Sequence, residues 1–147
     1  TQKAWLAGFI DGEGSIIMHK TKRKSITANQ CYHGRVEITN TNRESLELVK
    51  SWYGGTIGNH KTHNPKARLA YRWSVSNKKG IKRILMDILP YLKIKNRHAE
   101  IMLQYIEENQ LEHAAGVRHR LSKETVLKRE PFVEELRMLN RRGVIYA

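Results

Sequence analysis

Two glycines, Gly8 and Gly12, lie in an apolar segment near the start of the chain and restrict how it can fold. The neighbouring Leu6, Phe9 and Ile10 spread around most of a helical wheel, which predicts a helix buried on nearly all sides. A glycine inside a helix costs about 1 kcal/mol relative to alanine, so we expect a compensating contact. Spaced four residues apart, the glycines share one helix face, which predicts close packing against a second helix.

Two carboxylates, Asp11 and Glu13, follow at the expected end of this helix. The negative pole of the helix dipole disfavours acids there, and a purely structural sequence would place lysine at this end. Gly14 is expected to cap the helix in a left-handed conformation and to lead into a strand from Ser15. A divalent cation would relieve the repulsion, so the junction of helix and strand is a candidate metal site.

The charge of the chain predicts a polyanionic partner. Lysine and arginine number 27 and aspartate and glutamate 14 among 147 residues, which gives a net charge of +13. Nucleic acid is the first candidate. The single cysteine, Cys31, excludes an intrachain disulfide and a cysteine-based zinc site. No apolar run is long enough to span a bilayer and no secretory signal is evident, so we expect no membrane partner and an intracellular location, in the cytoplasm or an organelle or nucleoid.

Hydrophobic periodicity along the chain predicts an α+β domain. After the opening helix we expect a hairpin from residue 15 with a return strand at 32–40, a helix at 43–53, strands at 56–60 and 68–76, and helices at 79–89 and 97–110. This αββαββα order indicates a four-stranded antiparallel sheet with helices on one face, plus C-terminal helices. We expect residues 1–110 to form the core and 111–147 a basic, helical extension of the same domain, with Pro131 opening a short helix. Trp5 and Trp73 are expected in the core.

A sheet covered by helices on one side leaves its other face free for a ligand. Alternation directs Val36 and Ile38 toward the helices and the intervening side chains toward the free face. That face collects polar and basic groups, which suit the major groove of DNA, although any one of them could equally be an ordinary solvated residue. The candidate DNA contacts are Ser15, Ile17, His19, Thr21, Arg23, His33, Arg35, Glu37, His60, Arg68, Arg72 and Ser74.

Residues 6–14 resemble the signature of the LAGLIDADG homing endonucleases. Phe9 stands for the second Leu of the signature, Gly12 for the second Ala and Glu13 for the last Asp. The following strand and the high basicity agree with the resemblance. It implies a site-specific endonuclease, encoded by a mobile intron or intein, that makes double-strand breaks in DNA.

The resemblance also implies an arrangement of two copies, in which the glycine-bearing helices pack together and bring their terminal acids to a shared two-fold axis. Because the chain holds one copy of the motif, we expect a homodimer that reads a long, near-palindromic site in double-stranded DNA. The expected interface residues are Ala7, Gly8, Asp11 and Gly12.

The resemblance further implies Mg²⁺-dependent hydrolysis. Glu13 of each subunit would hold Mg²⁺, with the backbone carbonyl of Gly12 as a further ligand. Asp11 is assigned to the helix end and the dimer seam, with metal binding as the lesser alternative.

A polar cluster is expected around this metal, again by resemblance. Asn40 would position water and Arg43 would offer positive charge to the phosphate. Lys95 matches the lysine that the family brings back toward the active site, and a plain surface lysine is the alternative.

Three rival functions stay open. An RNA-binding maturase could use the same scaffold to assist splicing without cutting, and a non-catalytic DNA-binding regulator could use it to bind DNA alone. A generic basic ribosomal-type protein is the third rival. The acid at the helix end favours cutting, because a protein that only binds nucleic acid has no reason to keep Glu13 there.

Overall fold

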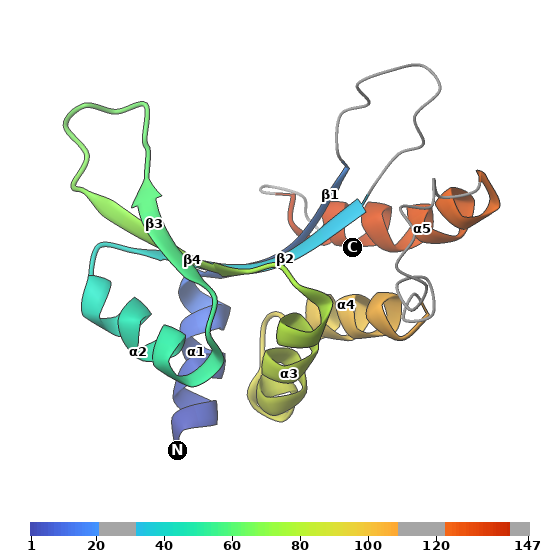
Figure 1. Ribbon diagram of the computed structural model, residues 1–147, viewed down its shortest axis with the longest axis horizontal. Coiled ribbons are helices and arrows are strands. Elements are labelled where there is room, and N and C mark those ends of the chain that lie inside the picture. Colours follow the sequence, from blue (N-terminus) through green and yellow to red (C-terminus); the bar gives the residue numbers. More distant parts are fainter. Residues whose placement is uncertain (21–31, 109–122, 142–147) are drawn as a thin grey trace.

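The computed structural model describes residues 1–20, 32–108 and 123–141 (Figure 1). Cys31 lies outside these residues. The described elements are α1 (Gln2–Glu13), β1 (Gly14–Lys20), β2 (Tyr32–Asn40), α2 (Arg43–Tyr53), β3 (Thr56–His60), β4 (Ala70–Val75), α3 (Lys78–Ile88), the 3₁₀ turn η1 (Leu89–Tyr91), α4 (Asn96–Glu108) and α5 (Lys123–Leu139). The α+β class and the order of elements through α4 are confirmed. Within the described residues, no helix has the length and apolar character needed to cross a membrane.

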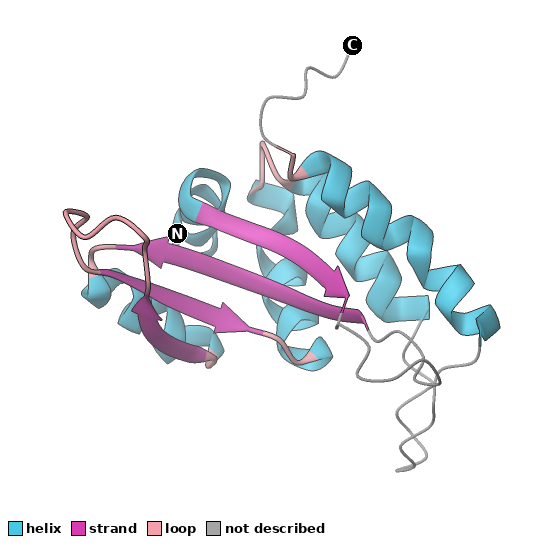
Figure 2. Cartoon of the chain, turned by 90° about the horizontal axis from the view of Figure 1, so that it is seen from above, coloured by secondary structure: helices cyan, strands magenta, loops and turns pink. Residues whose placement is uncertain are grey.

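The strands form an antiparallel sheet in the order β1-β2-β4-β3. Val36 pairs with Ile16 on one side and with Val75 on the other, and Ile38 pairs with Trp73. All five side chains are buried, as the alternation of apolar and polar residues predicts. The described helices α1 to α4 lie beneath this face in Figure 1, and the four strands lie in front of them in Figure 2. No described helix covers the opposite face of the sheet, which we call the open face.

One hydrophobic cluster joins the sheet to the helices. Helices α2 and α3 are amphipathic, and their N-caps are side-chain acceptors, Asn42 for Ser45 N–H and Asn77 for Gly80 N–H. The C-terminal helix α5 contributes buried Val133 and Leu136 to the same cluster. The helix residues buried in this core include Leu6, Ala7, Ile10, Leu46, Val49, Ile81, Ile84, Leu85, Ile88, Ala99, Ile101, Met102 and Ile106.

Helix α1 is less enclosed than its composition predicts. Leu6, Ala7 and Ile10 are fully buried, but Trp5 is 44% exposed, so its predicted place in the core is wrong. The described residues cover only one side of α1, and Trp5 lies toward the other side, edge-on to Trp52 with ring centroids 5.7 Å apart. The prediction for Trp73, which is fully buried, is confirmed.

Gly14 does not cap α1 in a left-handed conformation. Its φ of −90° and ψ of 169° are extended values open to any residue. A Cβ at this position would lie 2.8 Å from Ile10 Cα and 2.9 Å from Ile10 O, which is too close for backbone atoms that cannot move aside. Gly14 is therefore required by the close approach of β1 to α1, and the predicted reason for it is wrong.

Two predicted boundaries are also wrong. The fourth strand begins at Ala70 rather than at residue 68, because its neighbour β3 ends at His60, which pairs with Ala70. Pro131 lies inside the 17-residue helix α5 instead of opening a short helix. Its ring is on the exposed side, while Val133 and Leu136 hold the opposite side in the core and offset the missing N–H hydrogen bond.

Candidate active site and open sheet face

The C-terminal end of α1 is tied to a loop that is distant in sequence. The Asp11 carboxylate accepts backbone N–H groups from Lys93, Ile94 and Lys95 at 2.8, 3.2 and 2.9 Å. The Lys95 Nζ atom in turn donates to the Asp11 carbonyl oxygen at 2.6 Å. Asp11 thus fixes the segment between η1 and α4 beside the end of the helix. This role explains the acid without a metal ion.

The charges at this end of α1 are largely balanced by the chain itself. Burial alone would raise the pKa of Asp11, but the backbone N–H groups of Lys93, Lys95 and Ile94 and the charge of Lys95 bring it below its usual value. Burial lowers the pKa of Lys95, with Asp11 and Glu13 opposing that shift. The last turn of α1 contains no basic residue of its own, so Lys95 supplies the cation that the helix end favours.

Glu13 is the acid that the fold leaves available. It is the last residue of α1, its side chain is exposed, and it is close enough to Lys95 to act on that lysine's pKa. Within the described residues, no side chain or backbone group hydrogen-bonds or ion-pairs with its carboxylate. An exposed carboxylate without a partner is unusual beside a helix end that disfavours it.

The donor atoms here fit part of a Mg²⁺ site. Mg²⁺ prefers oxygen ligands, keeps several waters, and is often held by one or two carboxylates together with phosphate. The Glu13 carboxylate and the Gly12 carbonyl are ligands of this kind. In the described ranges, no three metal-ligating side chains cluster, so a single chain offers only an incomplete set.

Asn40 and Arg43 lie at the same end of the sheet as Glu13. Gly14, at the start of β1, pairs with Ile38, so the end of β2 at Asn40 extends past the beginning of β1. The Asn40 side-chain oxygen accepts the Asn42 N–H at 2.8 Å. Arg43 Nε lies 3.2 Å from Glu47 Oε1 on the next turn of α2, and its guanidinium covers the ring of Tyr71.

Most of the predicted sheet-face residues do share the open face. Cross-strand pairing sets Ser15 beside Glu37 and Glu37 beside Ser74, and it sets His19 beside His33. Arg68 is an exception, because it precedes β4 and is not part of the sheet. Thr21 and Arg23 lie outside the described residues. The residues of the set that lie on described strands and outside the buried core are Ser15, Ile17, His19, His33, Arg35, Glu37, His60, Arg72 and Ser74.

Four of these residues interact across three strands, and we call them the Glu37 cluster: Arg35, Glu37, Arg72 and His60. Glu37 Oε2 lies 2.9 Å from Arg35 Nε and 3.7 Å from Arg72 Nε. Arg72 Nη2 lies 2.7 Å from His60 Nδ1. The sequence predicts these residues as separate DNA contacts and does not predict their association. The two-residue spacing of Arg35 and Glu37 was a usable signal, but the link to Arg72 depends on strand order.

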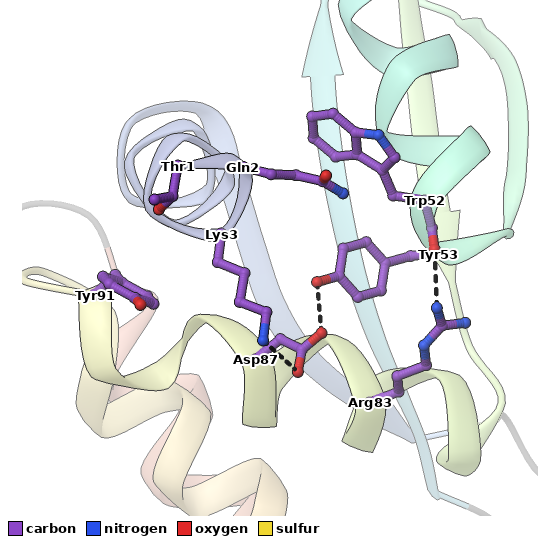
Figure 3. Close-up of a pocket in the computed structure, with 8 residues that line it drawn as sticks. All are labelled: Thr1, Gln2, Lys3, Trp52, Tyr53, Arg83, Asp87 and Tyr91. Carbon is purple, nitrogen blue, oxygen red and sulfur yellow. Dashed lines mark hydrogen bonds and ion pairs between the residues drawn. The ribbon is translucent and has the colours of Figure 1, made fainter.

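A cavity of about 420 Å³ lies at the opposite, N-terminal end of α1 (Figure 3). Asp87 on α3 accepts the Tyr53 hydroxyl at 2.7 Å and pairs with Lys3 at 3.5 Å. Arg83 donates to the Trp52 carbonyl oxygen at 3.1 Å. These bonds tie α1, α2 and α3 together, and burial, with the Asp87 contact, raises the pKa of Tyr53 to about 12. No pattern in the sequence predicted this polar cluster.

The residues predicted for the dimer interface differ in how accessible they are. Gly8 and Gly12 are exposed, and a Cβ added to either would meet nothing within 4 Å. Ala7 is fully buried inside its own chain, so its predicted place on the outer face of α1 is wrong. The register of a helix explains the difference, because Ala7 lies with Leu6 and Ile10 on the face toward the sheet.

Comparison with known proteins places these features in a family. The family model described as LAGLIDADG endonuclease matches residues 6–108, which run from the apolar segment of α1 to the end of α4. The chain belongs to the LAGLIDADG endonuclease family. The resemblance drawn from residues 6–14 is therefore confirmed.

Two curated LAGLIDADG relatives are similar over most of this chain. The intron-encoded DNA endonuclease ai2b of Dictyostelium discoideum is 27% identical over 111 residues, which are 76% of this chain and 37% of the relative. The DNA endonuclease I-CreI of Chlamydomonas reinhardtii is 28% identical over 108 residues, 71% of this chain and 61% of the relative. The chain thus spans less than two thirds of the length of either relative.

Solved structures agree with the fold. The homing endonuclease I-CvuI, crystallised with the I-CreI target in the presence of Mg, has a TM-score of 0.74 at 19% identity, covering 99% of this chain and 85% of that one. The archaeal intron-encoded homing endonuclease I-Vdi141I, complexed with DNA, has a TM-score of 0.75 at 20% identity, with 99% and 88% covered. The LAGLIDADG fold predicted for this sequence is confirmed.

Proposed function

We propose that this protein is a site-specific homing endonuclease that makes double-strand breaks in a long, near-palindromic DNA site and depends on Mg²⁺. The observation that carries the proposal is Glu13, an exposed and unpartnered acid at the tip of α1, beside Lys95 and at one end of the open sheet face. A DNA backbone lying on this face would bring phosphates to the acid. The expected location is wherever that DNA lies, in the cytoplasm or in an organelle or nucleoid.

We propose a homodimer as the working form. Gly8 and Gly12 leave an open strip along α1 where a second helix backbone can approach, and the adjacent Trp5 is 44% exposed. Two copies of α1 packed along this strip would bring two Glu13 carboxylates together. The metal-ligating set that is incomplete in one chain would then be doubled, which supports an assembly of two copies.

The residues around Glu13 have distinct expected roles. Glu13 and the Gly12 carbonyl would hold Mg²⁺, which when bound supplies an activated water and stabilises negative charge on the phosphate. Lys95 is held in place by the Asp11 carbonyl, so its ammonium group is a fixed positive charge near the acid. Asn40 would orient water, and Arg43 would leave Glu47 to contact a phosphate.

The sheet face provides the DNA contacts in this proposal. Arginine reads guanine in the major groove, and serine and histidine contact either bases or phosphates. The net charge of +13 supports binding to a polyanion. The two solved relatives described above were crystallised with DNA, which supports the same assignment.

A randomised DNA library tests the proposal. The protein is first confirmed as a dimer by light scattering, and is then incubated with the library in Mg²⁺ or in EDTA. We expect double-strand breaks at one near-palindromic sequence in Mg²⁺ and none in EDTA. Tight binding to DNA without cleavage would contradict the proposal and favour a DNA-binding regulator, and preferential binding to structured RNA would favour a maturase.

A further inference from the structure

Glu37 is more enclosed than the two arginines of the Glu37 cluster. Its side chain is 14% exposed, whereas those of Arg35 and Arg72 are 31% and 36% exposed. Glu37 Oε2 and the Nε atoms of both arginines are buried, and none of the three has an aligned hydrogen bond in the described structure. The charges thus meet against the sheet, beneath the surface that a ligand would touch.

The cluster follows a diagonal across the sheet. The residues directly opposite Glu37 on β1 and β4 are serines, Ser15 and Ser74, which carry no charge. Arg72 is paired with Thr39 on β2, two residues beyond Glu37, so it reaches Glu37 diagonally. His60 holds the other side of Arg72 from β3. The Arg72 guanidinium therefore contacts both Glu37 and His60, whereas that of Arg35 pairs with Glu37.

This arrangement suits base recognition by arginine. Reading guanine with two hydrogen bonds requires the guanidinium plane to be aligned with the base edge. A free arginine loses rotamer freedom when it adopts that alignment, and a partner that orders it in advance removes this loss. The Glu37 carboxylate attracts both guanidinium groups from the Nε side, at 2.9 Å from Arg35 Nε and 3.7 Å from Arg72 Nε. This attraction restrains the two side chains without using their terminal nitrogens, which serve as donors. Since two guanidinium groups share one carboxylate, the cluster still attracts DNA.

We propose that Glu37 is a positioning residue for sequence recognition, which holds Arg35 and Arg72 so that they read guanines and makes no base contact itself. The inference rests on the proposed function. It changes the expected role of Glu37 from a DNA contact to a residue that acts through its two arginine partners.

The test measures discrimination and affinity separately. The affinity of the protein is measured for its selected site, for every single-base-pair variant of that site, and for unrelated DNA. Glu37→Gln keeps the size of the side chain and removes its charge. Glu100→Gln is the matched control, because it removes the same charge from an exposed ion pair on α4.

We expect Glu37→Gln to bind unrelated DNA at least as tightly as the unmodified protein. At the base pairs read by Arg35 and Arg72, the ratio of its affinities for the correct and the altered base pair should fall about tenfold. At all other positions this ratio should stay unchanged, and the Glu100→Gln control should keep the ratio of the unmodified protein at every position. In an Arg35→Ala background, Glu37→Gln should cause no further loss at the Arg35 position. If Glu37→Gln does not fold, Glu37→Asp, which keeps the charge and shortens the reach, should show the same loss.

Three results would overturn the inference. Discrimination could stay unchanged at every position, or fall equally at all positions as for a merely structural residue. It could also fall at one base pair that neither Arg35→Ala nor Arg72→Ala affects, which would mean that Glu37 reads a cytosine directly. If the unmodified protein selects no DNA sequence at all, the proposed function and this inference are both wrong. If it selects a sequence and Glu37→Gln keeps the full profile, only this inference is wrong.

Discussion

At the scale of single residues, the two acids at the end of α1 have separate roles. The Asp11 carboxylate accepts three backbone N–H groups from the segment between η1 and α4 and holds that segment in place, while Glu13 stays exposed beside Lys95. Electrostatic reasoning from the sequence treated both acids as costly at a helix end. The fold removes that cost for Asp11 alone, and this difference points to Glu13 as the acid kept for function.

Asp11→Asn should lower the free energy of unfolding by about 1 to 2 kcal/mol at pH 7, because backbone N–H groups bind a carboxylate more strongly than an amide. The pKa of Asp11 is lower in the folded chain than its usual value, so its contribution is complete above about pH 4 and is lost as the pH falls through the lowered value. Urea unfolding of both proteins at several pH values measures the difference. A difference in unfolding free energy between the two proteins that stays constant into strong acid would contradict this account.

At the scale of elements, the sequence predicts what local chemistry decides. Alternation located the face of β2, with Val36 and Ile38 buried, and Asn42 marked the start of α2. The errors came from contacts between segments far apart in the chain. The Asp11 bonds link residues 82 to 84 positions apart, and Trp5 is partly exposed because the part of the chain that the structure describes covers only one side of α1. Neither fact can be obtained from local periodicity.

For the site residues, too, the sequence predicts what lies in one continuous segment and not what depends on long-range contacts. The family signature identified Glu13 and the end of α1, because those positions lie in one continuous segment. It could not reveal that Glu37, Arg72 and His60 associate, since this depends on β4 lying between β2 and β3. It also gave no sign of the Tyr53–Asp87 bond between α2 and α3.

Gly14→Ala should destabilise the chain by about 1 to 3 kcal/mol, because the added Cβ would lie 2.8 Å from the Ile10 Cα in a backbone that cannot yield. Gly58→Ala is the matched control, since its Cβ would meet nothing within 4 Å and its φ is not left-handed. Denaturant unfolding compares the two variants. Equal stabilities would mean that β1 can shift away from α1, against the packing described here.

At the scale of the whole molecule, helices α1 to α4 lie on one face of the sheet (Figures 1 and 2). The other face carries mostly polar side chains, and Glu13 is exposed at the end of α1, where β1 begins. Within the described residues, no helix packs on the Gly8 and Gly12 strip of α1, and the metal-ligating side chains do not form a set of three. In the proposed homodimer, a second copy packed on that strip would supply both a facing helix and a second Glu13. The central claim is therefore that the two Glu13 residues of a dimer, one from each chain, act together at one site.

The most direct measurement is the single-turnover rate of DNA cleavage by Glu13→Gln, at protein concentrations that saturate the selected site in Mg²⁺. The account predicts unchanged DNA binding and dimer mass, with cleavage at least about a hundredfold slower, since a metal ion stabilises the transition state by several kcal/mol. Glu100→Gln should cleave at the rate of the unmodified protein. Undiminished cleavage by Glu13→Gln would contradict the account and move the active site elsewhere.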